Sequence, residues 1–80
     1  MLALTEVPEG SRVAVVDLLV RGWGIRRRLM EMGLAPGSIV EVVNNTHGPV
    51  VVRVRGVVVA IGRGVASKIL VRLLEVGGNA

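Results

Sequence analysis

Residues Gly24–Gly37 read GIRRRLMEMGLAPG and place one short helix directly before a tight turn. Ile25, Leu29 and Met32 follow one another at the i, i+4, i+7 spacing of a helix. This spacing predicts a helix from about Ile25 to Met32 and puts these three side chains on the face that contacts the core.

The residues after this helix predict how it ends. Gly33 is expected at the first position beyond the helix, where the left-handed backbone conformation costs glycine nothing. Leu34 is expected to close the apolar contact that accompanies such an ending. Pro36 and Gly37 fit the two central positions of a type II turn.

The rest of the chain is rich in valine and predicts short strands separated by glycine and polar turns. The expected strands are Arg12–Val20, Ile39–Val43, Val50–Val54, Val57–Ile61 and Ile69–Leu74, with one helical turn near Val65. The predicted fold is mainly β, an SH3-like, partly open barrel of about five strands with a helix between the first two. Residues 1–76 are expected to form one domain and residues 77–80 a frayed tail.

The composition leaves two interpretations of the apolar residues open. Hydrophobic residues make up 51% of the 80 positions, and Trp23 is the only aromatic residue. They either fill a dense aliphatic core or leave an exposed apolar patch for a partner. Apolar runs of about five residues fall far short of the roughly 20 that cross a membrane, and no signal peptide is recognisable. We therefore expect a cytoplasmic protein without direct membrane insertion.

The charge favours an acidic partner more than nucleic acid. The chain carries a net charge of +4, and nine of its ten basic residues are arginine. Apart from Arg26-Arg27-Arg28 the positive charges are scattered, and the aromatic side chains that single-strand binders stack on bases are missing. Nucleic acid is therefore not a predicted partner, and a nucleic-acid-binding barrel stays only an alternative.

No metal site is predicted. His47 is the only histidine and lies in a polar loop, and the chain has no cysteine. An iron(II) site of the common type needs two imidazoles and a carboxylate, or several carboxylates. The six acidic residues are spread singly, at Glu6, Glu9, Asp17, Glu31, Glu41 and Glu75.

No catalytic or cofactor site is predicted either. Ser11 and Ser38 have no histidine or lysine nearby in sequence, and the Ser67-Lys68 pair is ordinary at a helical turn. The glycine pairs lack the lysine and hydroxyl residue that hold a nucleotide phosphate and its magnesium ion. We expect a protein that is not an enzyme and uses no cofactor.

The helix and turn carry a family likeness. Arg28–Gly37 resembles the RL-x-x-(L/M)-G-L-x-P-G signature of FeoA proteins. Leu4 and Gly10 resemble the opening of that family, although Val7 stands where leucine is usual, and Gly48–Ile61 and Ala66–Val71 resemble its hairpin and its ending. The likeness extends from Leu4 to about Leu74.

This resemblance implies an SH3-like cytosolic accessory of ferrous iron uptake, which meets the cytoplasmic GTP-binding region of the membrane transporter FeoB. A second copy of the chain is a further expected partner, through a valine-rich strand edge. The same fold also forms the C-terminal domain of iron-dependent repressors, so a stand-alone relative of that domain is another alternative. The loops Asn44–His47 and Gly62–Gly64 depart from the family pattern.

The candidate partner-binding residues surround the helix. Trp23 is either a core plug or an exposed anchor, because tryptophan suits both roles. Arg26 and Arg27 either meet an acidic partner or form a solvated face, with Arg27 paired to Glu31. Met30 and Leu34 would complete an apolar patch with a basic rim. The predicted docking set is Trp23, Arg26, Arg27, Met30 and Leu34.

Overall fold

A single curved sheet of six antiparallel strands organises the computed structural model, which describes residues 1–77. The strands lie in the order β1-β6-β2-β3-β4-β5, with one 3-10 helix, η1, and two helices, α1 and α2. The predicted mainly β, SH3-like architecture is confirmed. The bounds are β1 Leu2–Ala3, η1 Leu4–Glu6, β2 Arg12–Leu18, α1 Trp23–Glu31, β3 Ile39–Asn44, β4 Val50–Val54, β5 Val57–Ile61, α2 Arg63–Ala66 and β6 Ile69–Glu75.

The additional strand is β1, which pairs with β6. Its two residues precede η1, well before the first expected strand, Arg12–Val20. Two residues are too short to show the alternation by which a strand is recognised. The first long strand, β2, ends at Leu18, two residues earlier than expected.

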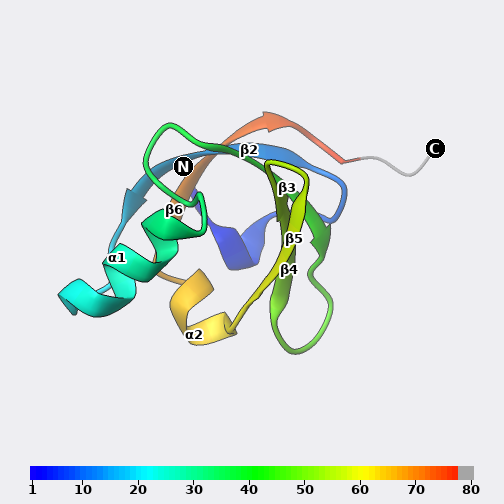
Figure 1. Ribbon diagram of the computed structural model, residues 1–80. Coiled ribbons are helices and arrows are strands. Elements are labelled where there is room, and N and C mark those ends of the chain that lie inside the picture. The colour runs from blue at the N-terminus through cyan, green and yellow to red at the C-terminus, as the bar shows by residue number, and fades with distance from the viewer. Residues whose placement is uncertain (78–80) are drawn as a thin grey trace.

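The sheet curves around its own core. Figure 1 shows β2 and β6 crossing one side of the molecule and β3, β4 and β5 descending on the other, with η1 between them. The register shifts between Val15 and Asp17 in β2 and between Val42 and Asn44 in β3. Such bulges bend a strand and increase its twist. The curvature lets one sheet surround most of an apolar core, which η1, α1 and α2 complete.

The core is almost entirely aliphatic. Its side chains come from the inward faces of five strands, from η1, α1 and α2, and from the segments that connect them. The composition therefore does build a dense aliphatic core. The buried set is Leu4, Val7, Val13, Val15, Leu18, Val20, Leu29, Leu34, Val40, Val42, Val50, Val52, Val54, Ile61, Ala66, Ile69 and Val71. Even so, eleven large apolar side chains within residues 1–77 remain exposed.

Helix α1 ends as the sequence predicts. Gly33 adopts a φ of +95°, its N–H donates to the Met30 carbonyl at 3.0 Å, and the Leu34 N–H donates to the Leu29 carbonyl at 2.9 Å. These two bonds are those of a Schellman ending, and they satisfy carbonyls that the helix leaves without partners. The predicted turn follows, with the Ser38 N–H bonded to the Ala35 carbonyl at 2.9 Å and Gly37 at φ +95°.

The predicted core stripe of α1 is wrong at its first position. Leu29 is buried and Met32 packs partly against the core, but Ile25 is 42% exposed. The helix starts at Trp23 and contacts the core only through its second half. Its first turn therefore projects beyond the sheet, as Figure 1 shows for the cyan end of α1.

The C-terminal end of β6 is joined to the start of β2. The Gly77 N–H donates to the buried Ser11 Oγ at 2.6 Å, 66 residues away in sequence. The predicted tail thus begins with a residue that the structure bonds to the domain. Residues 78–80 of that tail lie outside the described residues.

Candidate docking surface on helix α1

The first turn of α1 presents the only aromatic side chain of the protein to solvent. Gly22 takes a φ of +98°, which turns the chain from β2 into α1 and places Trp23 at the first helical position. Trp23 is 76% exposed, so it is a surface residue and not a core plug. Tryptophan in this position offers a large apolar contact area at a low cost in side-chain entropy.

Trp23, Arg27 and Met30 lie on one face of the helix, because they follow the i, i+4, i+7 spacing. Together with Glu31 they line a shallow hollow of about 410 Å³. Met30 is 47% exposed. We call Trp23, Arg27, Met30 and Glu31 the α1 outer surface. It combines apolar area with one cation and one anion.

The charges of the α1 outer surface partly compensate each other. Arg27 Nε lies 3.5 Å from Glu31 Oε2, the predicted i, i+4 ion pair, and both side chains are mostly exposed. An exposed pair of this kind contributes only about 0.3–0.5 kcal/mol. Both side chains are therefore free to exchange this partner for one on another protein.

Arg26 is directed toward the protein body. Its Nη1 donates to the Leu18 carbonyl at 2.7 Å, and its Nη2 lies 3.5 Å from Asp17 Oδ1. These contacts attach α1 to the end of β2. Of the two arginines in the predicted docking set, Arg27 is the one that faces solvent on the α1 outer surface.

Leu34 does not belong to an exposed patch, and this part of the prediction is wrong. Its side chain has 0% exposure and is part of the core. The Schellman ending turns the residue after Gly33 back toward the helix, where it makes the apolar contact that such endings favour. The structure therefore brings Trp23, Arg27 and Met30 together and separates Leu34 from them.

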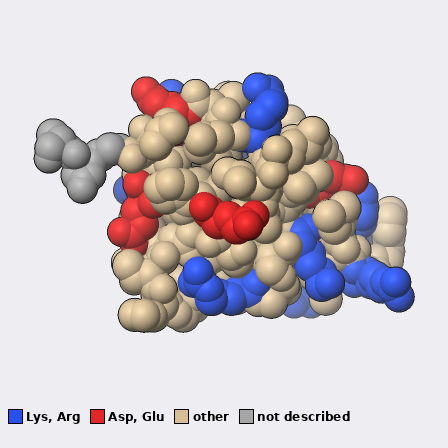
Figure 2. Space-filling view, turned by 180° about the vertical axis from the view of Figure 1, so that it is seen from behind, with Lys and Arg blue, Asp and Glu red and all other residues tan. Residues whose placement is uncertain are grey.

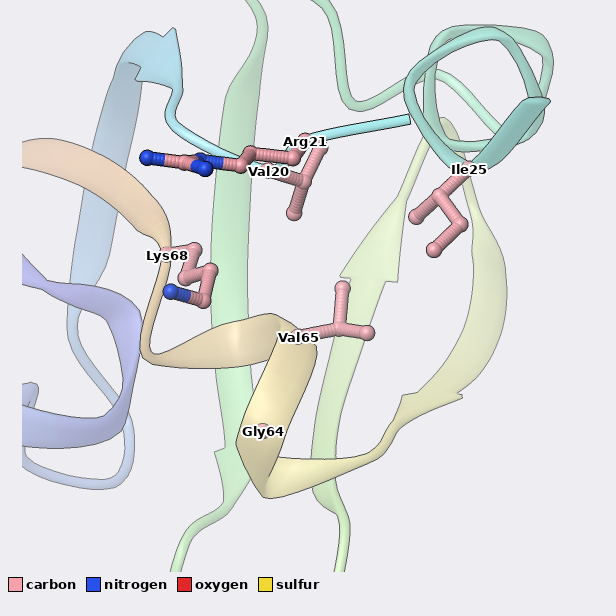
Figure 3. Close-up of a pocket in the computed structure, with 6 residues that line it drawn as sticks. All are labelled: Val20, Arg21, Ile25, Gly64, Val65 and Lys68. Carbon is pink, nitrogen blue, oxygen red and sulfur yellow. The ribbon is translucent and has the colours of Figure 1, made fainter. Parts of the chain in front are cut away.

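A second hollow, also of about 410 Å³ and not predicted from the sequence, lies on the opposite flank of the first turn of α1. It is lined by Val20, Arg21, Ile25, Gly64, Val65 and Lys68, and we call it the α1–α2 groove (Figure 3). No local pattern could reveal it, because its two halves are more than 35 residues apart.

Positive charge gathers near these surfaces. Figure 2 shows Lys and Arg side chains along the lower edge of the molecule and toward the side on which α1 lies. Within residues 1–77 four arginines pair with carboxylates: Arg12 with Glu75, Arg26 with Asp17, Arg27 with Glu31 and Arg53 with Glu41.

The described residues contain neither a cluster of metal ligands nor a membrane-spanning helix. Among the described residues, no three side chains of the histidine, aspartate and glutamate types lie close enough together to hold a metal ion. No helix within residues 1–77 has the length and hydropathy needed to span a bilayer.

Comparisons with known proteins agree with one another. The model of the FeoA domain family matches residues 2–73. A protein of Methanocaldococcus jannaschii named "Putative Fe(2+) transport protein A" is 41% identical over 79 residues, which cover 99% of this chain and 95% of that protein.

Solved structures share the fold over nearly the whole chain. A crystal structure of an iron uptake regulatory protein, FeoA, has a TM-score of 0.80 and 37% identity, covering 91% of this chain and 96% of that one. A zinc complex of FeoA from Stenotrophomonas maltophilia has a TM-score of 0.72 and 28% identity, covering 90% and 91%. That protein is described as a prokaryotic SH3 domain protein and suggested to be a ferrous iron transport activating factor.

Proposed function

We propose, because this chain belongs to the FeoA family, that it is a non-enzymatic accessory protein of ferrous iron uptake. It docks on the cytoplasmic GTP-binding region of the FeoB transporter and modulates its activity. The relatives support the transport role, since one carries Fe(2+) transport in its name and another is suggested to activate it.

One observation favours docking through α1: Trp23 is 76% exposed and shares a helix face with Met30 and Arg27. A solvent-exposed tryptophan contributes little to folding, yet tryptophan is enriched among the residues that dominate binding energies. Arginine and methionine are likewise enriched at interfaces. The α1 outer surface thus has the composition of a small interface centre.

The chain would modulate the transporter by binding its conformations with different affinities. A protein that binds one conformation of the transporter more tightly than another shifts the population toward that conformation. The chain needs no reagent of its own for this, because the transporter supplies the nucleotide chemistry. Its contribution is the binding free energy that differs between the two states.

The strand edge of β5 supports a second partner, another copy of the chain. Within the described sheet β5 pairs only with β4, and Val57 and Val58 are 60% and 56% exposed. An uncharged edge of β-branched residues is a template for pairing with a further strand. We propose that two copies associate through β5 at high concentration.

Iron uptake in cells that lack the endogenous gene tests the proposed function. The native chain should restore uptake, and Trp23→Ala should restore at most about one tenth of the gain, because truncation of an interface anchor typically costs tenfold or more in affinity. Leu74→Ala is the matched control, since Leu74 is 42% exposed on β6, away from the α1 outer surface. Equal uptake with and without the native chain would contradict the proposal.

A further inference from the structure

The α1–α2 groove has an apolar floor and a cationic side. Val20 is 8% exposed and belongs to the core, Val65 packs against the core, and Ile25 is 42% exposed. In Figure 3 the side chains of Val20, Ile25 and Val65 point into one shared space, while those of Arg21 and Lys68 extend together to one side of it.

The fold itself builds this groove. Leu18 at the end of β2 lies opposite Ile69 at the start of β6, and the Leu19 N–H donates to the Lys68 carbonyl at 2.7 Å. These contacts hold the β2–α1 connection beside the end of α2. Arg21 and Lys68 are therefore kept on the same flank although they lie 47 residues apart.

The two cations of the groove have no carboxylate partner among residues 1–77. Asp17, the acidic residue at the end of β2, is engaged by Arg26 at 3.5 Å. Arg21 and Lys68 are both exposed. Two adjacent like charges without a counter-charge raise the local positive potential and favour an anionic ligand.

We propose that the α1–α2 groove binds an acidic, apolar segment of a protein partner. An aliphatic side chain of that segment fills the space between Val20, Ile25 and Val65, and a neighbouring carboxylate meets Arg21 and Lys68. Nucleic acid fits the groove less well, because no aromatic ring lines it for base stacking. The inference rests on the proposed function in one respect: the segment belongs to the cytoplasmic region of FeoB.

A charge-reversal series on the full chain tests the assignment, with binding to the purified cytoplasmic region of FeoB measured by calorimetry. Lys68→Glu and the double variant Arg21→Glu/Lys68→Glu should weaken the affinity by about threefold and tenfold or more, respectively. Arg72→Glu is the matched control for Lys68→Glu, because it likewise replaces a positive charge by a negative one, at an exposed position on β6. It should change the affinity by less than about twofold, since it alters only the long-range field.

A steric variant tests the shape of the groove separately from its charge. A Cβ at Gly64 or at Gly62 would meet no heavy atom within 4 Å, and neither residue has a positive φ. Both Gly64→Leu and Gly62→Leu are therefore expected to fold. Gly64→Leu should weaken binding several-fold because Gly64 lines the groove, whereas Gly62→Leu should not.

The outcomes separate this inference from the proposed function. If the native chain does not bind the FeoB region at all, the proposed function fails. If the native chain binds and Lys68→Glu binds as well as Arg72→Glu, the groove assignment alone is overturned. Lys68-dependent binding to vesicles of phosphatidylglycerol, with none to the FeoB region, would also overturn it.

Discussion

Gly33 shows how much of the architecture depends on one residue. Its φ of +95° is accessible to glycine at little cost, and a Cβ at this position would lie 2.8 Å from Val54 Cγ1. Val54 is buried and β-branched, so its side chain has little freedom to move aside. The residue therefore ends α1 and also allows the helix end to pack closely on β4.

Gly33→Ala should lower the free energy of unfolding by about 2–4 kcal/mol, the sum of the left-handed backbone cost and overpacking against Val54. Urea denaturation measures this change. Gly24→Ala is the matched control: Gly24 lies in the first turn of α1 with open space around it, and the substitution should stabilise by about 0.5 kcal/mol. Equal stability of Gly33→Ala and the native chain would show that the helix end tolerates a side chain there.

Trp23 is expected to matter for binding and not for folding. Trp23→Ala should change the free energy of unfolding by less than about 0.5 kcal/mol, because the side chain is mostly in solvent. Its affinity for the FeoB region should fall at least tenfold. Urea denaturation and calorimetry on the same preparation check both parts, and a large loss of stability would place Trp23 among the structural residues instead.

At the scale of the elements, Asn45 joins three segments that the sequence leaves unconnected. Its Nδ2 donates to the carbonyls of Thr5 and Val7 at 2.9 and 2.8 Å, and its Oδ1 accepts from Arg63 Nη2 at 2.7 Å. The β3–β4 loop is thus tied to the end of η1 and to the start of α2. The sequence predicts only a polar connection here. Side-chain hydrogen bonds between residues 18 to 40 positions apart produce no pattern among neighbouring residues.

Asn45→Ala should destabilise the protein by about 2–3 kcal/mol, since it leaves two part-buried carbonyls without their donor and removes one of the two hydrogen bonds of the Arg63 guanidinium. Asn44→Ala at the neighbouring position is the control, because the Asn44 side chain is exposed and accepts only from Thr46. Its cost should stay near about 0.5 kcal/mol. Thermal and urea unfolding measure the loss of stability in both variants. An equal loss in the two would contradict the connecting role of Asn45.

The free edge of β5 leads to a prediction about self-association. Val58→Lys puts a charge on an exposed position of the edge strand, which is how natural sheets block edge pairing. If two copies pair through β5, sedimentation at rising concentration should show a dimer for the native chain and a monomer for Val58→Lys. A native chain that stays monomeric up to millimolar concentration would contradict pairing through this edge.

For the molecule as a whole, the sequence predicts what is local and misses what depends on distant contacts. The helix ending at Gly33, the turn at Gly37 and the β4–β5 hairpin are each specified by adjacent residues, and each is confirmed. The core position predicted for Ile25 is wrong, because the side on which α1 packs depends on the curvature of the sheet. Leu34 makes the apolar contact that the helix ending predicts, and this contact removes it from the docking set.

The candidate sites likewise combine features that neighbouring residues predict with features that depend on distant contacts. Arg27 and Met30 lie within the predicted helix, but Trp23 precedes its predicted start at Ile25. The three side chains share one face because the helix begins at Trp23, which only the structure shows. The α1–α2 groove could not be predicted, because the pairing of β2 with β6 brings Arg21 to Lys68. The residues of a surface made by one helix can therefore be predicted in part from this sequence, and those of a groove made between distant elements cannot.

The most direct test of the central claim is a calorimetric titration of the full native chain into the purified cytoplasmic region of FeoB, without nucleotide and with GDP or a non-hydrolysable GTP analogue. Binding should be saturable, with an affinity that differs between nucleotide states, because modulation requires a differential free energy of binding. Absence of binding in every nucleotide state would contradict it.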